Sequence, residues 1–220
     1  DNGVTASATF GIEIDDEGSA SDAATTGFFG SNDFGLLSNS LLLSLTTETL
    51  GLHFGDTSFA AESQWSAAGD MEADAFSEAD GEVVLRADVM YSGVSASVSY
   101  AIANNAGGYV ADDGATGSAG DQLSLGASGA FGMVNFSAAY QVEADNTTYF
   151  GGDFVPNEVM GVSAGTTVAG ADISVAYAKW TGIAPSTEEL TSMGIQVAYP
   201  IGPVTATVYY VAEDNEAGDA

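Results

Sequence analysis

Hydrophobic and polar residues alternate along most of the chain with a period of two, which is typical of β-strands. Near the start, Val4, Phe10 and Ile12 share one side, whereas Thr5 and Glu13 lie on the other. Little of the chain has helical spacing. The alternation predicts eleven strands, at residues 4–14, 41–46, 50–55, 82–91, 94–102, 122–131, 134–143, 160–168, 171–177, 192–199 and 204–211.

Short connections alternate with long ones between these strands. Tight turns, most of them rich in Gly or Pro, are expected at residues 47–50, 92–93, 131–133, 169–170 and 200–203. Longer polar loops are expected at residues 15–39, 56–80, 104–120, 144–157 and 181–188, and an acidic tail at 213–220. All tight turns therefore fall at one end of the strands, which predicts an antiparallel up-and-down meander.

Two all-β architectures could produce this pattern. In a soluble sandwich the apolar sides pack into a core, whereas in a transmembrane barrel they face lipid and the polar sides line a wet lumen. Strand lengths near ten residues and polar sides made of Ser, Thr, Gly and Ala favour the barrel. Tyrosines near strand ends also suit a membrane-interface girdle, although Tyr is common in any strand; they are Tyr91, Tyr100, Tyr140, Tyr177, Tyr199 and Tyr210.

Charge and composition narrow the possible functions. The 220 residues carry 31 acidic and 2 basic side chains, a formal charge of −29, which argues against nucleic acid as a partner. Because 45% of residues are hydrophobic, the chain can fold despite this charge. The absence of cysteine excludes disulfides and Cys-ligated zinc. No apolar stretch is long enough for a transmembrane helix.

Catalysis finds little support in the sequence. The single histidine, His53, has no Ser or Cys in a recognisable nucleophile setting, so a Ser–His–Asp triad is not predicted. No Gly-rich phosphate-binding loop is present. We expect a protein that is not an enzyme.

Four segments give the chain a family resemblance. They read LSLTTETLGLHFGD at 43–56, SFAAE at 58–62, VLRADVMYSGVSASVSY at 84–100 and LGASGAFGMVNFSAAY at 125–140. In this order they resemble the general porins of Rhodobacter-like alphaproteobacteria. The resemblance implies a sixteen-stranded, homotrimeric barrel in the outer membrane of a Gram-negative bacterium, through which small hydrophilic solutes and ions diffuse passively. Membrane lipid and lipopolysaccharide would then be its surroundings.

The chain departs from this family in its strand count. Eleven strands are predicted instead of sixteen, and an open sheet would leave unpaired edges in lipid. We therefore expect residues 1–220 to be one porin-like domain and an internal portion of a longer porin, although a closed smaller barrel would also satisfy the pattern.

The loop at residues 56–80 is the candidate constriction of the pore. It is too long for an ordinary connector, and the resemblance implies that it folds inward and narrows the lumen. With so few basic residues, the lumen should be negative and the channel should prefer cations. The candidate constriction residues, including the wall that faces the loop, are Glu62, Asp70, Glu72, Asp74, Glu78, Asp80, Glu82, Arg86, Asp88 and His53.

The basic side chains and His53 have alternative roles. Arg86, on the lumen side of its strand, could create a transverse field with the acidic loop, or form a local salt bridge with Glu82 or Asp88. His53 shares the lumen side and suits a hydrogen-bonded wall position. Lys179 keeps the lipid-facing side beside Trp180, where its amine could reach the interface.

Acidic clusters in two other loops could bind calcium. Carboxylate oxygens suit Ca²⁺, but neither cluster fits an EF-hand, and a solvated acidic surface is the favoured explanation. No other cofactor is expected. The candidate calcium ligands are Asp15, Asp16, Glu17 and Asp22, and Asp112, Asp113 and Asp121.

The competing function class is a secreted or cell-surface acidic β-sandwich, such as an adhesin or a calcium-stabilised surface-layer component. The two classes differ in which side of the strands is dry. A sandwich would bury residues such as Val98 and Phe136, whereas a barrel would expose them to lipid.

Overall fold

A computed structural model describes residues 3–15, 35–74, 76, 82–104, 109–110, 116–117, 122–143, 156–182 and 189–216. Its main feature is one eleven-stranded antiparallel sheet in which strands follow one another in chain order, with β1 and β13 at its two sides. The strands are β1 Thr5–Asp15, β2 Gly35–Thr46, β3 Leu50–Gly55, β4 Glu82–Tyr91, β5 Val94–Asn104, β8 Gln122–Phe131, β9 Val134–Glu143, β10 Pro156–Val168, β11 Ala171–Gly182, β12 Glu189–Ile201 and β13 Val204–Glu216.

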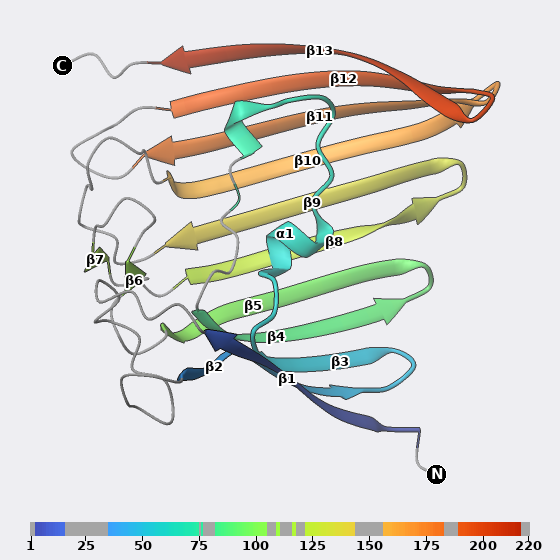
Figure 1. The fold of residues 1–220 in the computed structure, drawn as a ribbon. Coiled ribbons are helices and arrows are strands. Elements are labelled where there is room, and N and C mark those ends of the chain that lie inside the picture. Colours follow the sequence, from blue (N-terminus) through green and yellow to red (C-terminus); the bar gives the residue numbers. More distant parts are fainter. Residues whose placement is uncertain are drawn as a thin grey trace.

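The predicted meander with two different ends is confirmed. Figure 1 shows the tight turns together at the right-hand end of the strands. Ser92–Gly93 and Ala169–Gly170 have positive φ at both residues, as two-residue hairpins of the I′ type require. In the turn after β2, Thr47 N–H donates to the Leu50 carbonyl at 2.7 Å.

Several strands are longer than predicted at the loop end. β2 begins at Gly35 and β10 at Pro156, inside segments predicted as loops, and β11 continues to Gly182. The acidic tail predicted from residue 213 is wrong in its first part, because β13 continues to Glu216 in register with β12. Acidic residues disfavour strands in isolation, but a neighbouring strand offers these residues backbone partners that a local pattern cannot reveal.

Short elements occupy two of the predicted loops. The segment after β3 contains helix α1, Ala60–Gln64, and a 3₁₀ turn η1, Glu72–Asp74. The predicted loop at 104–120 contains two short paired strands, β6 Tyr109–Val110 and β7 Thr116–Gly117. Among the described residues, no helix is long and apolar enough to cross a membrane.

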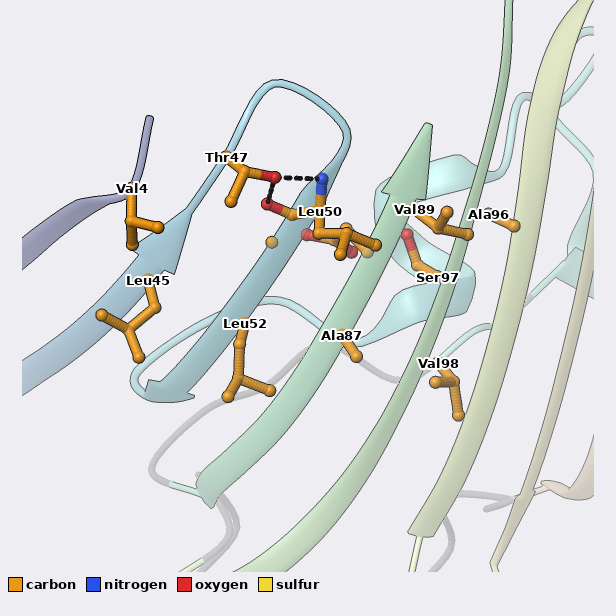
Figure 2. A pocket seen from close by; sticks show the side chains of 12 residues that line it. Val4, Leu45, Thr47, Leu50, Leu52, Ala87, Val89, Ala96, Ser97 and Val98 are labelled. Carbon is orange, nitrogen blue, oxygen red and sulfur yellow. Dashed lines mark hydrogen bonds between the residues drawn. The ribbon is translucent and has the colours of Figure 1, made fainter. Parts of the chain in front are cut away.

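The two faces of the sheet have opposite character. The apolar face is exposed: Val98 is 43% exposed, Leu45 51% and Tyr210 68%. Figure 2 views this face between β1 and β5, where Leu52, Ala87 and Val98 stand side by side. The opposite face, called here the inner face, carries the buried Ser99, Ser124, Ser137 and Ser192.

This distribution is incompatible with a sandwich. Apart from the short β6–β7 pair, the described strands form one large sheet, and the large side chains on its apolar side are exposed. Burial instead occurs on the polar side, beneath α1 and the residues that follow it, which lie across the sheet in Figure 1. The sandwich alternative is therefore wrong.

Candidate functional site: the inner face and the segment that crosses it

Residues 57–74, called here the inner segment, are held to the inner face by side chains of the strands. In the first half, Ala60 N–H donates to Ser99 Oγ at 2.8 Å and Ala61 N–H to Ser124 Oγ at 2.7 Å. Gln64 Nε2 donates to Ser97 Oγ at 2.9 Å. Serine hydroxyls thus satisfy backbone N–H groups that the single-turn helix α1 leaves unpaired at its start.

The second half of the segment reaches the far strands of the sheet. Gly69 N–H donates to Gln196 Oε1 at 3.2 Å, and Ala73 N–H donates to Ser192 Oγ at 2.9 Å. Glu72 N–H donates to Glu213 Oε1 at 2.8 Å. Beneath these bonds lies an apolar cluster of Ala68, Met71, Ala73, Ala176, Ala178 and Leu190, with Trp65, Ala67, Trp180 and Val211 packed against it.

The inner segment covers part of the polar face that was predicted to line a wet lumen. Ser124 and Ser192 are 0% and 1% exposed because the inner segment covers them. The inner face of β11 and β12 also supplies apolar contacts, including Leu190. Strand periodicity identifies which side chains point inward, but not which of them another segment covers.

Three glycines in the middle of strands allow the inner segment to approach the sheet closely. A Cβ at Gly126 would overlap the Ala60 carbonyl oxygen, one at Gly161 the Trp65 indole, and one at Gly194 the Ala68 carbonyl oxygen. These residues were not singled out from the sequence. A signal was available, because a glycine inside a strand often marks close approach of another backbone.

A second group of inner-face residues lies where the inner segment leaves β3. His53 Nδ1 is 2.9 Å from Ser44 Oγ, and His53 Nε2 is 3.1 Å from Asp88 Oδ2. Arg86 Nε lies 3.2 Å from Asp88 Oδ1, and its Nη1 donates to the Ser58 carbonyl oxygen at 3.0 Å. Strand register explains the cluster, because Ser44 pairs with His53 and His53 pairs with Arg86.

The resulting row Ser44–His53–Asp88 has the residue types of a hydrolase triad, which sequence reasoning did not expect. The sequence separates its members, and only strand pairing brings them together. Acyl transfer also requires donors for an oxyanion. Ser44 lies in β2 between β1 and β3, so its neighbouring backbone N–H groups belong to the sheet ladder. Within the described residues, the row is therefore a hydrogen-bonded network of the wall.

Acidic side chains of the inner segment differ in exposure. Glu62 on α1 is half-buried, whereas Asp70 and Glu72 are exposed. Asp74 ends η1, but its side chain lies outside the described residues, as does that of Glu82 at the start of β4. Glu78 and Asp80 lie outside the described residues altogether.

The sequence pattern of the Gram-negative porins matches residues 1–220. The chain belongs to this family. Its members are channel proteins of the outer membrane, and the curved meander with its inner segment is a porin fold. No curated protein sequence matches the chain significantly.

Solved structures show the same fold at low sequence identity. A mutant of the Rh. blastica porin is 16% identical with a TM-score of 0.60, covering 99% of this chain and 71% of that one. A porin refined at 1.8 Å resolution is 13% identical with a TM-score of 0.56, covering 98% and 85% of the two chains. OmpT, an outer membrane protein of Vibrio cholerae, is 13% identical with a TM-score of 0.54, covering 84% and 61%.

Lys179 and the candidate calcium ligands are the remaining predicted residues. Lys179, on the apolar face, forms an ion pair with Glu189, with Nζ 2.8 Å from Oε2. Asp15 ends β1 with its side chain outside the described residues, and the other candidate calcium ligands lie outside them entirely: Asp16, Glu17, Asp22, Asp112, Asp113 and Asp121. The described part of the chain holds no cluster of three or more metal-ligating side chains.

Proposed function

We propose that this porin forms a water-filled channel in the outer membrane through which small hydrophilic solutes and ions diffuse passively. The observation that carries the proposal is the distribution of apolar and polar side chains between the two faces of the sheet. Its exposed face is apolar, and its polar face binds a segment that crosses it from β4 to β13. An apolar exterior suits lipid, and a polar interior suits water and ions.

The inner segment is the constriction in this proposal. It is a chain excursion of the kind that narrows a lumen without closing it, and its contacts hold it against one wall. Its backbone lies close to that wall at Gly126 and Gly194, and its Trp65 ring lies close to the wall at Gly161. The exposed Asp70 and Glu72 give its free surface negative charge, and the exposed Asp56 directly precedes it.

The channel should prefer cations. Arg86 is the one basic side chain of the chain that lies on the inner face, and it is committed to Asp88 and to the Ser58 carbonyl. Asp88 balances its charge locally, so Arg86 leaves the carboxylates of Asp70 and Glu72 uncompensated. A negative lumen raises the local concentration of cations.

The double variant Asp70→Asn, Glu72→Gln tests both parts of this proposal. In lipid bilayers with a potassium chloride gradient, the parent should give a reversal potential of the cation-selective sign. The variant should lower the cation-to-anion permeability ratio by roughly twofold to fourfold, because two unit charges leave the lumen. Glu48→Gln removes one charge from a tight turn outside the inner face and is the matched control. Anion selectivity of the parent would contradict the cation preference, and absence of conductance would contradict the channel.

We further propose that the protein is a homotrimer in contact with lipopolysaccharide, and that calcium bridges its acidic loops. The net charge of −29 makes repulsion between loops large unless cations screen it. Crosslinking of the detergent-purified protein should give a trimer. Millimolar calcium should raise the melting temperature of that trimer more than magnesium does, and equal effects of the two ions would leave only general screening.

A further inference from the structure

His53 occupies a position in which either protonation state is satisfied. When the ring is neutral, Nε2–H donates to Asp88 Oδ2 at 3.1 Å and Nδ1 accepts from the Ser44 hydroxyl at 2.9 Å. When the ring is charged, Nδ1–H donates to the same hydroxyl oxygen, and only the hydroxyl hydrogen must turn. The wall therefore accepts a proton at His53 without a change in its heavy-atom contacts.

The charged groups around the ring are few within the described part of the chain. β4 contributes Asp88 and Arg86, which face the ring and balance one another. β2 contributes the uncharged Ser44. Gly51, two residues earlier on β3, leaves space for the ring, since a Cβ there would lie 2.9 Å from His53 Nε2. Protonation therefore changes the local charge from about zero to +1.

This charge would appear at the root of the inner segment. Arg86, bound to the same carboxylate as His53, donates to the Ser58 carbonyl, and Asp56, two residues before Ser58 in the chain, is exposed. The side chains of His53 and Asp88 are 17% and 29% exposed, so both remain in contact with the lumen. Imidazole is the side chain whose charge ordinarily changes between about pH 5 and pH 8.

We infer that His53 is a determinant of charge selectivity that lowers the cation preference of the channel in acid. The inference rests on the proposed function, because it needs a conducting pore that favours cations. A proton on His53 adds a second positive charge to an inner face that otherwise carries only Arg86. The unit charge opposes cation entry beside the acidic segment and so reduces the permeability ratio.

Reversal potentials at pH 7.5 and pH 5.5 test this inference. The cation-to-anion permeability ratio of the parent should fall by roughly twofold on acidification. His53→Gln stays uncharged and retains one donor group and one acceptor group, so its ratio should remain near the pH 7.5 value of the parent. His53→Lys should show the lower ratio at both pH values. The pH dependence of the His53→Gln variant measures the contribution of all other titratable groups.

The outcomes separate this inference from the proposed function. A cation-selective parent whose ratio does not change with pH, or changes equally in His53→Gln, overturns the role of His53 and leaves the channel intact. A parent without conductance, or with anion preference at pH 7.5, overturns the proposed function and the inference with it. A titrating imidazole resonance in the NMR spectrum of the parent, with its midpoint matching that of the selectivity change, would support the assignment.

Discussion

The glycines beneath the inner segment have no room for a larger side chain. Gly161 and Gly194 face the inner segment from neighbouring parts of the inner face, and each lies against a backbone or ring that is already in place. Ser99, Ser124 and Ser192 supply the matching polar contacts. The strand glycines thus allow the inner segment to approach, and the strand serines form hydrogen bonds with it.

Gly161→Ala should destabilise the porin by about 1–3 kcal/mol, because the new methyl group forces the Trp65 ring to move. The measurement is the free energy of unfolding by urea in lipid vesicles, with tryptophan fluorescence reporting on the ring. Gly165→Ala is the matched control on the same side of β10, where the nearest atom to a Cβ is 3.3 Å away. Equal effects of both variants would remove the special role of Gly161.

The inner segment connects strands that lie far apart in the sheet. It is bound to β5 and β8 through α1, and to β12 and β13 near η1. The first half is held mainly by hydrogen bonds and the second half also by an apolar cluster. Replacing one of these serines should lower the free energy of unfolding by about 1 kcal/mol, and the remaining contacts should still hold the segment in place. The segment is therefore a fixed part of the wall.

Most of these elements can be predicted from the sequence, and the reason is their period. Residues such as Val98 and Ser99 alternate without interruption, so the strands and their two faces follow directly. The ends of the strands are harder to predict. The carboxylate of Glu213, near the end of β13, accepts hydrogen bonds from the Ser192 hydroxyl and the Glu72 N–H. Such contacts join residues far apart in the chain, and no local pattern contains them.

The sequence predicts which side chains of the candidate site point inward, but not which hydrogen bonds and ion pairs they form. The inward side of Arg86 and His53 follows from strand alternation. Their partners do not, because Ser44 reaches His53 only through the register of β2 and β3. Likewise, the ion pair of Arg86 with Asp88 depends on geometry, and a register shift between Val83 and Val84 interrupts the alternation before Arg86.

For the molecule as a whole, the exposed apolar face determines where it can be stable. Val98 lies in the middle of this face, whereas Met133, which is 81% exposed, lies in a tight turn at its edge. Lys179 on the same face is at the loop end and is neutralised by Glu189. This arrangement keeps charge away from the centre of the apolar band.

Val98→Arg should therefore cost about 2–4 kcal/mol in lipid vesicles, whereas Met133→Arg should cost at most about 1 kcal/mol. Both substitutions introduce the same charge, so only depth in the membrane differs. Urea unfolding in vesicles measures both values. If Val98→Arg were tolerated as well as Met133→Arg, the apolar band would not face lipid.

The long reach of the inner segment also has a consequence for the order of assembly. Glu72 and its acceptor Glu213 are 141 residues apart in sequence, and Ala73 and Ser192 are 119 residues apart. Contacts of such separation form slowly, because the intervening chain must first be ordered. The second half of the segment can dock only after β12 and β13 are in place, so these contacts complete the attachment of the segment to the sheet last.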